Sequence, residues 1–305
     1  MILSGAENVI FFEVAKVELN GGALTGDGEF IVRGSTVVTV NVDTPIDILN
    51  LGSEVIGQVN LTVQKHLLWS AGILSGKGQI ISVTQLTIKD LVGGAPKFIH
   101  GRTLRNQGKA LWSNGDLAID QGGRIENELT GESTIGDIAD KQISGSFQEG
   151  GGFFNEGLVK FVKESAHRTS VYTPFSNSKR VEYGSQLLLY GGGVHSGAFV
   201  QTESQGSLEL RSSTNHLDEG FSSTSMQPVR IGGGTVNVRG AAKADQLRLD
   251  GGTLDGPDDL EVSRLFTWWS GTIRGSGVLR ILHNARMDWG SFNSPRELLA
   301  RLVEI

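Results

Sequence analysis

A short unit of strand, glycine turn and strand recurs along this chain and limits the folds that it can adopt. The clearest copy is FTWWSGTIRGSGVLRI at 266–281, and related copies begin at Trp69 (WSAGILSGKGQI) and Trp112 (WSNGDLAI). A second unit, LRLDGGTLDGPDDLEV at 247–262, is similar to VELNGGALTGDGEFIV at 17–32. Each unit is too small to bury its own apolar side chains, so it must stack on a neighbour.

Glycine usage agrees with many tight turns between short strands. The chain has 43 glycines but only 6 prolines among 305 residues, and leucine and β-branched residues fill the intervals. This composition indicates turns in a folded protein rather than a disordered linker. We expect an all-β fold, a single-stranded parallel β-helix (β-solenoid) with right-handed coils, in which about 20–25 residues per coil give about 12–15 coils. Asn-Gly and Asp-Gly pairs also occur, so antiparallel hairpins stay an alternative.

The C-terminal stretch departs from the repeat and predicts a helix. Ser294 is suited to the N-cap, Pro295 to the first helical position, and Glu297 follows three residues after the cap. One face of such a helix is apolar and consists of Leu298, Leu299, Leu302 and Ile305. We therefore expect a solenoid over 1–293 and an amphipathic helix over 294–305 that caps an open end of the solenoid.

Several of the units resemble repeats of a known group of proteins. TWWSGTIRGSG, GGTVNV, FNEGLVKF and LLLYGGGVHSG are similar to repeats of bacterial secreted β-solenoid proteins, which include adhesin-like, autotransporter-passenger-like and filamentous-haemagglutinin-like chains. The resemblance covers residues 17–290. It implies a structural or adhesive module with a carbohydrate or another cell-surface ligand, of extracellular or cell-surface origin. The N-terminus lacks the features of a signal peptide, so we expect a fragment of an exported chain or a cytoplasmic protein.

Charge and cysteine content exclude several classes of function. The formal charge of −6 is spread along the chain and no run of Lys or Arg exceeds two residues, which argues against nucleic-acid binding. No apolar run approaches the ~18 residues that a membrane span requires. The absence of cysteine excludes disulfides, thiolate catalysis and zinc–thiolate sites. None of these features selects an oligomeric state.

Adjacent tryptophans provide a candidate sugar-binding residue. Because side chains alternate along a strand, one of Trp268 and Trp269 is expected to point inward and the other outward. In the other two copies a leucine precedes the tryptophan. We therefore expect Trp69, Trp112 and Trp269 to form core at one corner, and Trp268 to face outward as a platform for a sugar ring.

Carboxylates on a glycine-rich turn provide a candidate metal site. Asp255, Asp258 and Asp259 offer oxygen ligands of the type that calcium prefers. The segment is not an EF-hand loop, and it lacks the glycine–aspartate repeat of calcium-binding β-rolls. Solvated turn aspartates are the alternative interpretation.

A polar interval at 212–228 is expected to be a loop, and it provides candidate catalytic residues. Three side chains in it can serve acid–base chemistry: His216, Asp218 and Glu219. His195, which follows three glycines, is a further candidate base. They predict an alternative function, a hydrolase or lyase acting on a polysaccharide or a small ester or lactone, with calcium as a cofactor. That function requires the intervals 163–174 and 212–228 to fold over one face and form a cleft.

Overall fold

The chain has two compact units, and each of them is a parallel β-solenoid. The computed structural model describes residues 2–3, 9–90, 97–136, 140–145, 150–162, 168–287, 296–299 and 301–305. The chain divides into unit 1 (Met1–Val159) and unit 2 (Lys160–Ile305). Together they make about 13 turns, which confirms the expected β-solenoid and the expected range of coil number. Among the described residues, all regular structure is strand.

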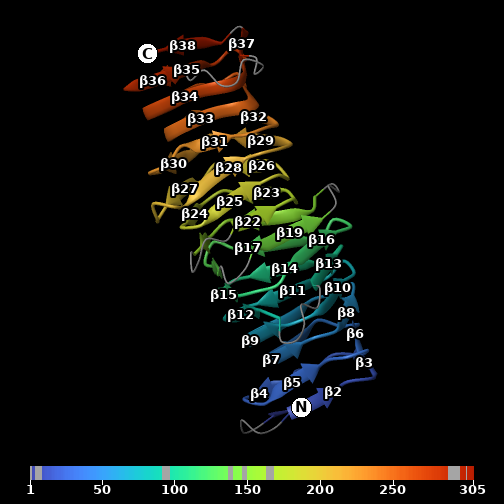
Figure 1. The fold of residues 1–305 in the computed structure, drawn as a ribbon. Helices are drawn as coiled ribbons and strands as arrows, with labels where there is room; N and C mark the ends of the chain where they lie inside the picture. The colour runs from blue at the N-terminus through green and yellow to red at the C-terminus, as the bar shows by residue number, and fades with distance from the viewer. Residues whose placement is uncertain are drawn as a thin grey trace. The chain divides into compact units, whose positions relative to one another are not determined.

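Unit 1 stacks its strands in three parallel columns (Figure 1). Column A contains β2 (Val9–Phe12), β5 (Glu29–Val32), the ends of β7 (Thr44–Leu51) and β9 (Leu61–Trp69), β12 (Gln85–Ile88), β15 (Lys109–Trp112) and β18 (Glu132–Ile135). Column B contains β3 (Lys16–Leu19), β6 (Val37–Val40), β8 (Glu54–Gly57), β10 (Gly72–Ser75), β13 (Lys97–His100), β16 (Leu117–Asp120) and β19 (Lys141–Gly145). Column C contains β1 (Ile2–Leu3), β4 (Thr25–Gly26), the starts of β7 and β9, β11 (Gln79–Ser82), β14 (Thr103–Asn106), β17 (Arg124–Asn127) and β20 (Gly152–Asn155). β21 (Leu158–Phe161) crosses the unit boundary.

Unit 2 also stacks its strands in three parallel columns. Column D contains β24 (Arg180–Tyr183), β27 (Ala198–Gln201), β30 (Ser222–Thr224), the starts of β33 (Ala242–Asp255) and β34 (Leu260–Arg274), β35 (Val278–Ile281) and β38 (Leu302–Glu304). Column E contains β22 (Arg168–Val171), β25 (Gln186–Leu189), β28 (Ser207–Leu210), β31 (Val229–Ile231), the middles of β33 and β34, and β36 (Asn284–Met287). Column F contains β23 (Phe175–Asn177), β26 (Gly193–His195), β29 (Thr214–Leu217), β32 (Thr235–Val238), the ends of β33 and β34, and β37 (Arg296–Leu299).

Ladders of inward-facing side chains form the core of each unit. The column A ladder of unit 1 is at most 4 % exposed and consists of Val32, Leu51, Trp69, Ile88, Trp112 and Ile135. The column E ladder of unit 2 includes Val171, Leu189, Leu210, Ile231, Leu249 and Trp268. Each fully buried Val, Leu or Ile contributes about 1.5–3 kcal/mol relative to an exposed one. Since the pairings within the columns are parallel, the hairpin alternative is excluded for them.

Glycine is required where one coil turns close above another. Gly72 has φ +94° and its counterpart Gly271 has φ +97°, a region that L side chains rarely adopt. A Cβ on Gly72 would lie 2.0 Å from the Ser53 carbonyl oxygen, and one on Gly271 would lie 2.3 Å from the Gly252 oxygen. The repeated glycines therefore set how closely successive corners stack.

The C-terminal helix prediction was wrong for the residues that the structure describes there. Those at 296–299 and 302–304 form β37 and β38, while Ser294 and Pro295 lie outside the described residues. Leu298 pairs with Ile273 and Val303 pairs with Leu279, so the stretch continues columns F and D. The solenoid below offers a row of unpaired backbone groups, and parallel pairing with that row overrides the helical pattern.

Candidate ligand-binding face

The two adjacent tryptophans have the reverse of the expected orientation. Trp268 is 6 % exposed and continues the column E ladder, and its Nε1–H donates to the Gly271 carbonyl at 3.3 Å. Leu249 pairs with Trp268 and Asp250 pairs with Ser270, so Trp269 is an extra residue in a β-bulge. Trp269 is half-buried. The prediction that Trp268 faces outward was therefore wrong, because the Trp-Ser match on which it rested sets the copies one residue out of register.

The spacing of the glycines indicates the correct alignment between the Trp69 copy and the copy that contains Trp268 and Trp269. Gly72, Gly76 and Gly78 recur at equal spacing as Gly271, Gly275 and Gly277. In that alignment Trp69 matches Trp268, whereas matching the Trp-Ser pairs aligns Trp69 with Trp269. The indole of Trp69 donates to Ala71 O at 2.9 Å, as that of Trp268 donates to Gly271 O. The expected core positions of Trp69 and Trp112 are confirmed, with 0 % and 3 % exposure.

His195 is a core residue of column F. It is 1 % exposed between Phe175 and Phe199, and its Nε2 donates to Asn215 Oδ1 at 3.1 Å. Burial lowers the pKa of this imidazole to about 4, so the ring is neutral at pH 7. A ring enclosed in this way does not reach a substrate at the surface.

The other candidate catalytic side chains lie on regular strands and turns rather than in an irregular loop. The interval expected to be a loop contains the strands β29 and β30, so the prediction of an irregular loop was wrong for those residues. His216 lies on the outward side of β29, and burial is the main cause that lowers its pKa. Asp218 accepts two hydrogen bonds from Arg239, at 2.9 and 3.1 Å, and Glu219 accepts one from the amide of Ala241 at 3.0 Å. These carboxylates therefore join one coil to the next. The expected cleft also required the interval 163–174, of which residues 163–167 lie outside the described residues.

Each of the three aspartates predicted to bind calcium forms hydrogen bonds with other residues of the chain. Asp255 accepts hydrogen bonds from Arg274 Nε at 2.8 Å and from the Gly256 amide at 2.7 Å. Asp259 accepts one from the Val278 amide at 2.8 Å, and the backbone carbonyl of Asp258 accepts one from a buried arginine. Within the part of the chain that the structure describes, no group of three or more His, Cys, Asp or Glu is arranged to hold a metal ion.

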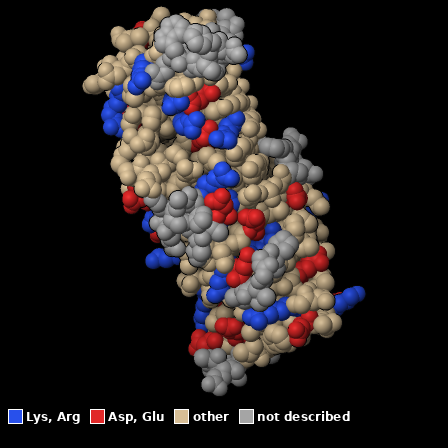
Figure 2. Space-filling view, in the orientation of Figure 1, with Lys and Arg blue, Asp and Glu red and all other residues tan. Residues whose placement is uncertain are grey.

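A chain of alternating charges runs across the outward side of column E, and the sequence reasoning missed it. Arg211 Nε lies 3.0 Å from Glu209, and Arg230 Nη1 lies 3.5 Å from the same carboxylate. Arg230 Nη2 lies 2.7 Å from Asp250, and Arg248 Nε lies 2.6 Å from the other oxygen of Asp250. We name these five residues the charge row. Figure 2 shows acidic and basic side chains gathered over β31 and β33.

The acidic side chains of the charge row are more deeply buried than its arginine side chains. The side chains of Glu209 and Asp250 are each 7 % exposed, whereas those of Arg211, Arg230 and Arg248 are 43 %, 42 % and 33 % exposed. Hydrogen bonding to Glu209 raises the pKa of Arg211. The surface of this row is therefore made of guanidinium groups, held in place by carboxylates beneath them.

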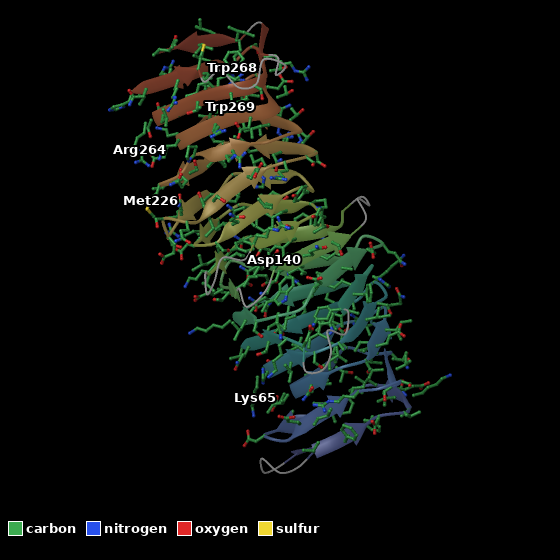
Figure 3. The ribbon with its side chains drawn as sticks, viewed as in Figure 1. Lys65, Asp140, Met226, Arg264, Trp268 and Trp269 are labelled. Carbon is green, nitrogen blue, oxygen red and sulfur yellow. The ribbon has the colours of Figure 1, made fainter. Side chains whose placement is uncertain are left out.

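Aromatic rings lie at both ends of the charge row. Tyr172 and Tyr190 stack with centroids 4.5 Å apart, and Arg211 lies 5.7 Å from the Tyr190 ring centre. At the other end the Arg248 guanidinium lies 4.8 Å from the ring centre of Trp269, which Figure 3 labels beside Trp268. Such cation–π contacts fix the plane of the guanidinium.

A groove of about 510 Å³ lies beside the charge row. Its lining is formed by Gln186, Ser204, Gln205, Gly206, Ser207, Gln227, Pro228, Arg230 and Arg248. This volume falls in the range of small-ligand sites, about 300–1,000 Å³, but amide, hydroxyl and guanidinium groups replace the usual apolar lining. The groove therefore suits a polar ligand that offers many hydroxyl groups.

Gln201 fixes both turns that form one wall of this groove. It is 6 % exposed, and its Nε2 donates to the carbonyls of Glu203 and Gly206 at 2.7 and 2.8 Å. Its Oε1 accepts from the amides of Met226 and Gln227 at 2.8 and 2.9 Å. The side chain is thus bonded to two successive coils at once, which holds the wall in one shape before a ligand arrives.

A second groove of about 420 Å³ lies on the outward side of column A in unit 1. Lys109, Glu132 and the half-exposed Leu111 are among its lining residues. Unit 1 also has alternating charges, Arg124, Glu126, Arg105 and Glu128, but they follow column C and none of them lines this groove. The groove of unit 2 is therefore the stronger candidate site.

The fold and this face define the class of the protein: a parallel β-solenoid that carries a polar groove on one column. Comparison with protein-family models, with curated proteins and with solved structures finds no match. Among the described residues no helix has the length and apolar character needed to cross a membrane.

Proposed function

We propose that this protein is a structural or adhesive β-solenoid that binds carbohydrate in the groove of unit 2. The observation that carries the proposal is a polar groove whose shape is set before binding. Gln201 holds one wall, and Glu209 and Asp250 hold the arginines of the other. Hydroxyl-rich ligands exchange hydrogen bonds with water for hydrogen bonds with such groups at little ordering cost.

The resemblance of the repeats to those of bacterial secreted β-solenoid proteins supports an adhesive role. In that setting the stacked coils serve as a rigid support, and specificity lies in side chains on one outward face. An extracellular or cell-surface location is part of this proposal, because glycans that an adhesive module recognises are displayed there.

The test is a binding experiment with the whole chain and a panel of oligosaccharides, measured by calorimetry. Ser207, a lining residue at the start of β28, is replaced by Tyr to fill the groove. Thr235, at the start of β32 and equally half-buried, is replaced by Tyr as the control. We expect Ser207→Tyr to abolish binding and Thr235→Tyr to leave it unchanged. Failure of every neutral and acidic oligosaccharide to bind, or equal binding by the two variants, would contradict the proposal.

A further inference from the structure

We infer that the groove of unit 2 selects anionic glycans, and that Arg248 is the residue that binds their acidic group. This inference rests on the proposed carbohydrate site and adds the chemical class of its ligand. The ligand would present an oxyanion, either a uronic acid carboxylate or a sulfate, on a sugar ring that lies in the groove. Three observations on the charges of the groove support it.

The groove has positive groups and no negative group in its lining. Arg230 and Arg248 are the charged residues among those that line it. The charge row as a whole has three arginines and two carboxylates, which leaves one net positive charge, whereas the whole chain carries −6. A carboxylate or sulfate in the groove would therefore meet guanidinium groups without repulsion from a lining carboxylate.

The hydrogen bonds distinguish the two lining arginines. Arg230 directs Nε and Nη2 to Asp250, at 2.9 and 2.7 Å, and Nη1 to Glu209 at 3.5 Å. Arg248 directs only Nε to Asp250, at 2.6 Å, among its recorded contacts with described residues. The two Nη groups of Arg248 are thus the donors left for a ligand, and they have the paired geometry that binds an oxyanion through two hydrogen bonds.

The surroundings of Arg248 hold it ready for such a ligand. Asp250 fixes its Nε, and the Trp269 ring lies 4.8 Å from its guanidinium carbon. Trp269 follows the inward-facing Trp268 and is the residue of the β-bulge that has no Cα partner in β33, which leaves its ring on the outward side beside Arg248. Gly232 leaves room for the Glu209 carboxylate of the charge row, since a Cβ at this position would lie 2.3 Å from Glu209 Oε1.

The experiment compares ligands that share a backbone and differ in charge. The probes are cellotetraose, the β-1,4-linked glucuronic acid tetramer, its methyl ester and sulfated cellotetraose. Binding is measured by calorimetry at low and moderate salt, with wild type, Arg248→Gln and Arg274→Gln. Arg274 is the matched control, because it also pairs with an aspartate (Asp255, 2.8 Å) in unit 2 but does not line the groove.

We expect the acidic tetramers to bind at least about tenfold more tightly than the neutral tetramer and the methyl ester, and added salt to weaken them. Arg248→Gln should remove this preference and Arg274→Gln should keep it. The relative affinity of the uronate and the sulfated tetramer identifies the oxyanion. If all four tetramers bind equally, or if the preference survives in Arg248→Gln, the inference is wrong while the proposed function stands. If no tetramer and no other oligosaccharide binds, both are wrong.

Discussion

Replacement of His195 by leucine should make the stability of the protein less sensitive to acid. The imidazole is enclosed in column F, where its ladder neighbour in the next coil is Leu217, so a leucine fits the same kind of position. Its Nε2 has one partner, Asn215, and its Nδ1 is buried with no recorded partner. Neither nitrogen meets an acid that would stabilise the protonated ring by direct contact.

The direction and size of the effect follow from the pKa of His195. Burial lowers this pKa from 6.5 to about 4 in the folded state. Between these values the unfolded chain holds a proton that the folded chain does not, so the free energy of unfolding falls as the pH falls from 6.5 towards 4. At about 1.4 kcal/mol per pKa unit, the contribution of His195 to this loss reaches about 3 kcal/mol. Above pH 6.5 the contribution to stability is fully present.

Urea unfolding of wild type and His195→Leu, followed by tryptophan fluorescence from about pH 7 to about pH 4.5, measures the effect. The difference in unfolding free energy between the two proteins should shift in favour of the variant by up to about 1.4 kcal/mol per pH unit. Phe199→Leu, which changes the neighbouring core without removing a titrating group, should differ from wild type by a constant amount. A His195→Leu difference that is equally constant with pH would refute the reasoning.

Two further pairs of substitutions test the packing described above. Trp268→Ala should lower the unfolding free energy by about 3–5 kcal/mol, because a buried ring is lost. Trp269→Ala should lower it by about 1 kcal/mol, because only the contact with Arg248 is lost. If thermal or urea unfolding gave the reverse order, the orientation expected from the sequence, with Trp268 outward, would be correct. Asn127→Leu should cost at least ~2 kcal/mol, since this 0 % exposed amide bonds to the coils above and below it at 2.8 Å and its loss leaves buried partners unsatisfied. Asn41→Leu, which removes an exposed amide pair, should change stability by less than about 0.5 kcal/mol, and equal costs for the two would contradict the ladder.

The fold could be predicted because its determinants are local. Glycine at corners such as Gly72 and alternation in strands such as 29–32 are both visible in the sequence. Repetition of those signals requires stacking, since one unit cannot bury its apolar side. The local signal failed at the C-terminus, where residues 296–304 have a helical pattern. There the available backbone partners of the preceding coil decided the structure.

The candidate site could not be predicted in the same way. Glu209, Arg230 and Arg248 lie about 20 residues apart in sequence and become neighbours only because their strands pair in register. The unequal coil lengths hide that register from a fixed period. Conversely, His195 and His216 are also one coil apart, but they lie on opposite sides of their strands.

The sequence by itself determined that this chain forms short strands, turns at glycine and stacks repeated units, whereas the parallel pairing is seen in the structure. The tertiary structure decided which side of each strand faces outward and which distant residues share a face. The physical reason is the two-residue period of a strand: an alignment that is wrong by one residue exchanges the inward and outward sides, as it did for Trp268 and Trp269. The pairing with Leu249 puts Trp268 into the core, and Trp269 lies against Arg248, where we infer that the protein meets its ligand.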